Sequence, residues 1–176
     1  FKKVTVINPN HADGFNNLGV TFHEQGKPGE AIEAYNKALS LKPDNAEAFN
    51  NKGNSLQEQG KLKEAIEAFD KAVSLKPDYA EAYNNKGTAL KEQGKLQEAI
   101  EAFDKALSLQ PSFTQAYNNK GIALKDQGKL KAAMKAFYEA LSLKPDFTEV
   151  YINMGIALQD QGKLDEAIEA YNRALT

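Results

Sequence analysis

The chain contains no cysteine, so disulfide bonds, thiolate catalysis and thiolate metal sites are excluded. Valine and isoleucine are sparse beside alanine and leucine, which favours helix over strand. No apolar run approaches the roughly 18 residues that would suggest a membrane-spanning helix. The formal net charge is −2, which gives no reason to expect nucleic acid or an anionic membrane as a partner.

Residue sets that support catalysis or cofactor binding are also missing. The two histidines, His11 and His23, are isolated in the sequence and form neither a metal site nor a catalytic triad. There is no phosphate-binding loop and no dinucleotide fingerprint. Aspartate and glutamate recur in every helix-like segment, as solubilising charges do, and are therefore no sign of an acid–base pair. We expect a chain that is not an enzyme and that needs no metal ion or cofactor.

What the sequence does contain is one motif that returns every 34 residues. A period in this range is typical of a solenoid, in which each unit buries its apolar face by stacking on a neighbour. Residues 1–11 resemble the second half of a preceding repeat's second helix, because Phe1, Val4, Ile7 and Pro9 align with the corresponding places of a full repeat. Five repeats are expected to follow, at 12–45, 46–79, 80–113, 114–147 and 148–176.

Each repeat is expected to hold two helices. The first ends at a glycine such as Gly94, which suits the left-handed position after a helix C-terminus. The second is expected from about Leu96 to Leu109, ahead of a proline that disfavours helix in the residue before it. Ser112 with Gln115 forms a predicted capping box at the next start. Carboxylate versions of this start signal are predicted at Asp44, Asp78 and Asp146.

The helical periodicity places small and apolar residues on two faces of each first helix. In the repeat 80–113, one stripe contains Gly87 and Leu90, and a second contains Ala82 and Ala89. Small residues let two helix backbones approach closely. A helix with two buried stripes is expected in a stack.

The pattern of small, apolar and aromatic positions resembles the tetratricopeptide repeat at this period. In the repeat 46–79 the matching residues are Phe49, Lys52, Gly53, Leu56, Ala65, Phe69, Ala72 and Pro77. The resemblance implies an all-α fold, a right-handed superhelical solenoid of antiparallel helix pairs. It also implies that the first helices line a concave groove that binds peptides.

Two rows of asparagines run along the predicted first helices. The first row is Asn16, Asn50, Asn84 and Asn118, and Ile152 interrupts it. The second row is Asn17, Asn51, Asn85, Asn119 and Asn153. The helical wheel predicts that both rows face outward. Because a carboxamide donates and accepts hydrogen bonds, either row could bind the backbone of an extended peptide.

A structural role is the alternative, in which these asparagines bond to a neighbouring repeat and order the stack. The second row resembles the asparagine ladder in the repeat domain of O-linked N-acetylglucosamine transferase. That resemblance implies residues that hold a substrate's backbone, and related arrays occur beside glycosyl- or sulfotransferase domains.

The charges on this face predict the kind of ligand. The carboxylate clamp of chaperone-binding tetratricopeptide domains needs lysine and arginine where asparagine stands here, so the clamp is absent. Lys91 and Lys125 only partly offset an acidic row, which favours a neutral or basic ligand. The acidic row is Glu24, Glu58, Glu92, Asp126 and Asp160. A purely solvated charged face is the alternative.

The sequence therefore predicts a protein-interaction scaffold that binds an extended protein or peptide segment. Two alternatives are open. The repeats could stack end to end into a structural array, because no polar helix caps the last repeat. The chain could also be the substrate-recognition arm of a glycosyl- or sulfotransferase.

Overall fold

The computed structural model describes residues 11–176, and this part of the chain holds ten α-helices and no strand. The prediction of an all-α fold is confirmed. The predicted end of a preceding repeat lies in residues 1–10, outside the described residues, apart from His11. The first helices of the repeats are α2 (Ala12–Glu24), α4 (Ala46–Glu58), α6 (Ala80–Glu92), α8 (Thr114–Asp126) and α10 (Thr148–Asp160). The second helices are α3 (Pro28–Leu41), α5 (Leu62–Leu75), α7 (Leu96–Leu109), α9 (Leu130–Leu143) and α11 (Leu164–Ala174).

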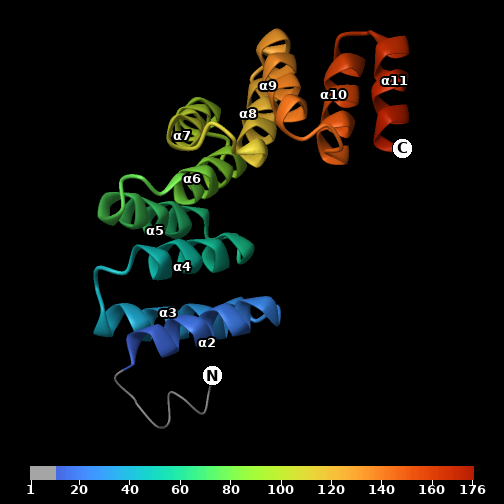
Figure 1. Ribbon diagram of the computed structural model, residues 1–176. Coiled ribbons are helices and arrows are strands. Elements are labelled where there is room, and N and C mark those ends of the chain that lie inside the picture. Colours follow the sequence, from blue (N-terminus) through green and yellow to red (C-terminus); the bar gives the residue numbers. More distant parts are fainter. Residues whose placement is uncertain (1–10) are drawn as a thin grey trace. The chain divides into compact units, whose positions relative to one another are not determined.

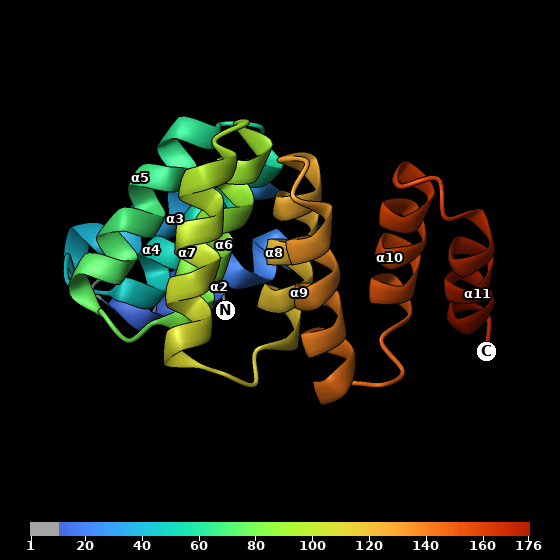
Figure 2. The ribbon, with the colours of Figure 1, turned by 90° about the horizontal axis from the view of Figure 1, so that it is seen from above.

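The chain divides into two compact units, one up to Gln93 and the other Gly94–Thr176. In the first unit, α2 packs on α3, α4 packs on α5, and the pairs follow one another in chain order (Figure 1). In the second unit, α8 packs on α9 and α10 on α11 (Figure 2). Each second helix also contacts the first helix that follows it within the same unit. The paired helices are therefore stacked as the repeat pattern predicts.

The glycine at the end of each first helix takes the left-handed conformation that was predicted. These glycines have φ between 69° and 81°. At Gly60 the backbone N–H donates to the carbonyl of Gln57 at 2.8 Å, and the next N–H, of Lys61, donates to Leu56 at 3.0 Å. These bonds satisfy the last carbonyl groups of α4 and turn the chain into α5.

The predicted start signals are wrong by one residue. The N-cap residues are Tyr79, Phe113 and Phe147, whose side chains make no capping bond, and Asn45, whose side chain accepts from the N–H of Ala48 at 3.0 Å. Before α6, the N–H of Tyr79 donates to the carbonyl of Lys76 at 3.1 Å. The proline and Asp78 therefore occupy the centre of a tight turn, where both are favoured residues. The aspartate belongs to the turn and does not cap the helix.

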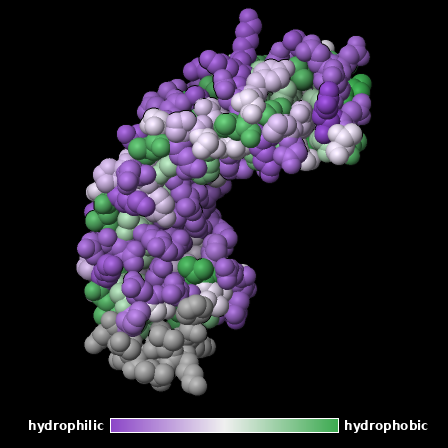
Figure 3. Space-filling view, in the orientation of Figure 1, coloured by the Kyte–Doolittle hydropathy of each residue, from purple (hydrophilic) through white to green (hydrophobic). Residues whose placement is uncertain are grey.

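A contact between a glycine and an aromatic ring lies in the core of four repeats, at Gly19, Gly53, Gly121 and Gly155. A methyl group built on Gly53 would lie 2.5 Å from the ring of Phe69, which is fully buried. Ala65 and Ala72, one helical turn on either side of that ring, are fully buried as well. The bare backbone of Gly53 thus lets α4 rest directly on the face of α5. Figure 3 shows hydrophilic groups over most of the visible surface, with hydrophobic ones in small separate groups.

Candidate functional site

The first asparagine row is buried, and the prediction that it faces outward is wrong. Asn16, Asn50, Asn84 and Asn118 are between 0% and 6% exposed. The side chains of Asn16, Asn50 and Asn118 lie where successive first helices of the same unit approach each other. Ile152, which interrupts this row, is 43% exposed. A carboxamide withdrawn from water in this way must be hydrogen-bonded or it destabilises the fold.

The hydrogen bonds of the first row run to the next repeat's second-row asparagine. The Nδ2 group of Asn51 donates to Oδ1 of Asn16 at 3.4 Å. In the same unit, Nδ2 of Asn85 donates to Oδ1 of Asn50 at 3.1 Å. In the second unit, Nδ2 of Asn153 donates to Oδ1 of Asn118 at 2.9 Å. The asparagine ladder is therefore present, and its rungs join neighbouring first helices.

Two members of the first row, Asn16 and Asn118, donate from Nδ2 to a glutamate in the first turn of the next first helix. Asn16 donates to Glu47 at 3.4 Å, and Asn118 donates to Glu149 at 2.9 Å. Asn50 differs, because its Nδ2 is buried and has no hydrogen-bond partner among the described residues. Glu81, at the corresponding position of α6, is exposed.

The second row lies partly open to solvent. Asn17 is exposed, and the other members of this row are half-buried. A carboxamide offers two N–H donors and an oxygen with two acceptor positions. Within the described chain, Asn51 and Asn153 each spend one donor on a rung. Their Oδ1 atoms and second N–H groups are held in a fixed direction and can bond to a ligand.

The acidic row is partly neutralised by the chain itself. The Glu58 carboxylate lies 3.4 Å from Nε2 of His23, and Glu92 accepts from Nε2 of Gln57 at 2.7 Å. A surface hollow of about 370 Å³ is lined by both carboxylates and by His23, Gln57 and Asn54. In the second unit, Lys125 pairs with Asp126 at 2.9 Å. The row's remaining members, Glu24 and Asp160, are exposed.

Two tyrosines beside these carboxylates hold their protons tightly. Burial raises the pKa of Tyr35 far above its ordinary value of 10.0, and carboxylates of α2 and α4 add to the effect. Burial, with help from Glu81 and Glu47, raises the pKa of Tyr79 to about 12. Both side chains are therefore neutral phenols at pH 7.

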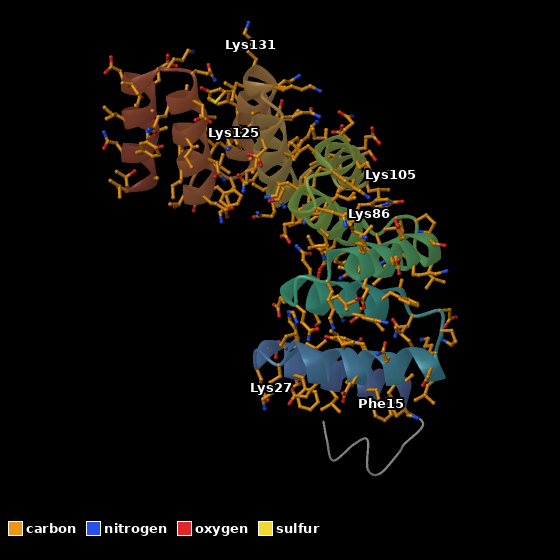
Figure 4. The ribbon with its side chains drawn as sticks, turned by 180° about the vertical axis from the view of Figure 1, so that it is seen from behind. Phe15, Lys27, Lys86, Lys105, Lys125 and Lys131 are labelled. Atoms are coloured by element: carbon orange, nitrogen blue, oxygen red, sulfur yellow. The ribbon has the colours of Figure 1, made fainter. Side chains whose placement is uncertain are left out.

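Ion pairs between repeats were not predicted from the sequence. Lys86 of α6, labelled in Figure 4, lies 2.6 Å from Asp70 of α5. In the second unit, Lys120 lies 2.5 Å from Asp104. The sequence does indicate these ion pairs, because Asp70 and Lys86 both recur 34 residues later, as Asp104 and Lys120.

Metal-binding groups and membrane-spanning helices were searched for in residues 11–176 only. In that part, no group of three or more histidine, aspartate or glutamate side chains could hold a metal ion. Of the helices described, none combines the length and the apolar character needed to cross a bilayer.

Paired helices, a glycine–ring contact in four of the repeats and hydrogen bonds between successive pairs within each unit define a helical solenoid, a class of repeat protein. A sequence profile described as "Tetratricopeptide repeat" matches residues 50–112 and again 84–146. Another, described as "TPR repeat", matches residues 21–60. Further "Tetratricopeptide repeat" profiles match residues 1–33 and 148–176. The chain belongs to the tetratricopeptide repeat (TPR) family. It is a TPR scaffold of the protein-interaction type.

Solved structures resemble the chain along most of its length. MamA is 32% identical with a TM-score of 0.80, over 90% of this chain and 92% of MamA. PilF of Pseudomonas aeruginosa is 25% identical with a TM-score of 0.84, over 93% of this chain and 75% of PilF. YrrB, described as a TPR protein with an unusual peptide-binding site, is 23% identical with a TM-score of 0.76, over 99% of this chain and 90% of YrrB. Comparison with curated protein sequences finds no match.

Proposed function

We propose that the protein binds an extended segment of a partner protein along its second asparagine row. The observation that carries this proposal is the orientation of the second-row carboxamides. Rungs to the buried first row hold Asn51 and Asn153 in place, while an oxygen and an N–H of each are left for a ligand. The donor and acceptor that Asn51 offers, and those of Asn153 in the other unit, can pair with peptide backbone of any sequence. Because packed helices lie roughly 8–10 Å apart, such a ligand would meet a rung at about every third residue.

The strength of this binding is limited. A net hydrogen bond contributes about 0.5–1.5 kcal/mol, so the three second-row positions of the first unit, Asn17, Asn51 and Asn85, supply at most about 1.5–4.5 kcal/mol. Micromolar affinity requires about 8 kcal/mol after the cost of ordering the ligand. The second row therefore aligns a ligand, and side-chain contacts elsewhere on the same face add the remaining affinity.

The charge of the face favours a neutral or basic segment. Glu58 and Glu92 both line the hollow in the first unit. Their polar neighbours there are neutral, apart from the titratable His23. A lysine or arginine side chain would therefore be attracted to the hollow, and an acidic one repelled. That YrrB, which shares the fold, is described with a peptide-binding site supports the same class of ligand.

The experiment uses fluorescent peptides of about ten residues, long enough to span three rungs, in basic, neutral and acidic sets. Basic and neutral peptides are expected to bind and acidic ones to bind more weakly. Asn51→Ala should weaken binding by about threefold to tenfold, since it removes one or two hydrogen bonds. Glu58→Gln should reduce the preference for basic peptides.

Asn16→Ala is the matched control, because it breaks the same rung from its buried side and keeps the carboxamide of Asn51 available to a ligand, although the rung no longer orients it. It is expected to lower thermal stability as much as Asn51→Ala while affecting peptide affinity less. Equal losses of affinity in the two variants would show that the row only orders the stack. The resemblance to the asparagine ladder of O-linked N-acetylglucosamine transferase would then give no support for peptide binding by this row.

A second candidate function, end-to-end association, is favoured by one observation. Leu164 and Ile168 of α11 are 59% and 57% exposed, whereas Ile100, which corresponds to Ile168, is 7% exposed beneath α8. This apolar face could receive a first-type helix of another molecule. End-to-end association would form assemblies whose size keeps increasing with protein concentration, and replacing Ile168 with Glu should abolish them.

A further inference from the structure

A second groove, which shares no residue with the asparagine rows, lies between α10 and α11. It has a volume of about 500 Å³ and is closed on one side by α9. Tyr151, Met154 and Leu158 of α10 form its apolar lining, and Tyr138 of α9 stands at its edge, 57% exposed. Arg173 and Glu169 of α11 lie at the rim. We refer to it as the α10–α11 groove.

The same groove exists in the repeat 46–79 but has a different lining. It measures about 480 Å³ and lies between α4 and α5. There Lys52 takes the place of Met154, and Lys71 takes the place of Arg173. The groove between α4 and α5 is open although α6 packs on α5, so a helix packed on the second helix of a repeat does not close this groove.

The α10–α11 groove lacks the ion pair found at two earlier repeat junctions, Asp70 with Lys86 and Asp104 with Lys120. The positions of Tyr138 and Met154 correspond to Asp70 and Lys86, which are 2.6 Å apart. Replacing both charges at once leaves an apolar surface where the earlier junction is polar. Arg173 is also the sole arginine of the chain. Tyrosine, methionine and arginine are the residue types enriched at protein interfaces, and here they gather in one groove.

The rim is complementary to itself. Arg173 and Glu169 lie one helical turn apart on α11, so two molecules related by a two-fold axis would place each arginine opposite the other's glutamate. Glu166, also at the rim, is already paired with Lys163 at 3.4 Å. The exposed ring of Tyr138 and the α10–α11 groove lie on the same face, so a protruding side chain is next to a cavity that could receive one. An isologous interface requires one surface that is complementary to itself, and this surface contains both charge signs as well as a protruding ring and a groove.

We propose that the α10–α11 groove is the contact surface of a two-fold homodimer, in which Tyr138 of each copy enters the groove of the other. Arg173 pairs with Glu169 of the second copy across the rim. The surface spans a single repeat, so the dimer is weak and forms in the micromolar range. The proposal does not depend on the peptide-binding function, which uses other residues.

The test is analytical ultracentrifugation of the full chain from low to several hundred micromolar. We expect a monomer–dimer equilibrium that stops at two copies. Tyr138→Asp combined with Met154→Lys restores the ion pair found at the earlier junction, so it should keep the fold, and it should weaken the dimer by at least about tenfold. Circular dichroism and the thermal midpoint verify that this variant is folded.

Charge reversal tests the rim. Arg173→Glu and Glu169→Arg should each weaken the dimer, and the two together should restore it, because the opposite charges again face each other. Lys71→Glu is the matched control at the corresponding position of the repeat 46–79, and it should change nothing. A chain that is monomeric at every concentration, growth beyond two copies, or an equal loss in Lys71→Glu would overturn the proposal.

Discussion

The Asn118–Glu149 hydrogen bond allows a direct test of the ladder, because Asn50 and Glu81 occupy the same positions without it. Asn118 donates to Glu149 at 2.9 Å, whereas Nδ2 of Asn50 has no partner in the described chain. Both asparagines are at most 1% exposed. The chain thus contains its own control, with the same residue pair in a bonded and an unbonded form.

The perturbation is a double-mutant cycle at each pair, with both residues changed to alanine singly and together. A hydrogen bond to a charged group contributes about 1.5–3 kcal/mol. Because the carboxylate of Glu149 is exposed, we reduce this to a coupling of about 1 kcal/mol. The Asn50–Glu81 pair should show a coupling below about 0.3 kcal/mol. Asn118→Ala should also cost about 1–2 kcal/mol more than Asn50→Ala, since the latter removes an unpaired buried N–H.

The assay is urea unfolding followed by circular dichroism, with all variants fitted to one nearest-neighbour scheme for the repeats. The cycle cancels differences in cavity size between the two sites, because only the pairwise term survives. Equal couplings at the two pairs would refute the reasoning. So would a coupling near zero at Asn118–Glu149.

Three further predictions concern stability. Gly53→Ala should destabilise the chain by about 2 kcal/mol in the same urea titration, because the added methyl group would lie 2.5 Å from a buried ring and overpack the core. Gly29→Ala should instead stabilise the chain by up to about 1 kcal/mol, because its methyl group would have no neighbouring atom closer than 3.6 Å. The folded state raises the pKa of Tyr35, so the protein should lose thermal stability as the pH rises above about 10, where the phenol of the unfolded chain ionises first. Tyr35→Phe removes the ionising group and should reduce this loss. Lys86→Met should cost less than about 1 kcal/mol at low salt and nothing at high salt, since its ion pair is partly exposed and screened.

The local features of the fold could be predicted from the sequence. The glycine at the end of each first helix and the span of α7 depend on neighbours in the chain, and both are as expected. The start signals were misplaced because Asp78 is a good residue for a helix cap and for a turn, and the preceding proline decides for the turn. The sequence pattern alone does not show which of the two structures forms.

The burial of the first asparagine row could not be predicted from one helix. A helical wheel shows which side chains share a face, but the distance between successive first helices decides which face is closed. Nor does the sequence show that Asn50 and Asn118 differ in their bonding, because each is followed by a glutamate 31 residues later. The ion pair of Asp70 with Lys86 could have been found, since acid and base appear together at two junctions and disappear together at Tyr138 and Met154.

The rungs of the ladder all point the same way along the chain. Asn51 donates back to Asn16, Asn85 to Asn50 and Asn153 to Asn118, and the donor is always in the later repeat. The carboxamides therefore form a polar row within each unit, with N–H and C=O groups in a fixed order. A peptide and its sequence-reversed counterpart, equal in composition and charge, would meet this order in opposite senses. A difference in their affinities would measure the polarity of the row directly.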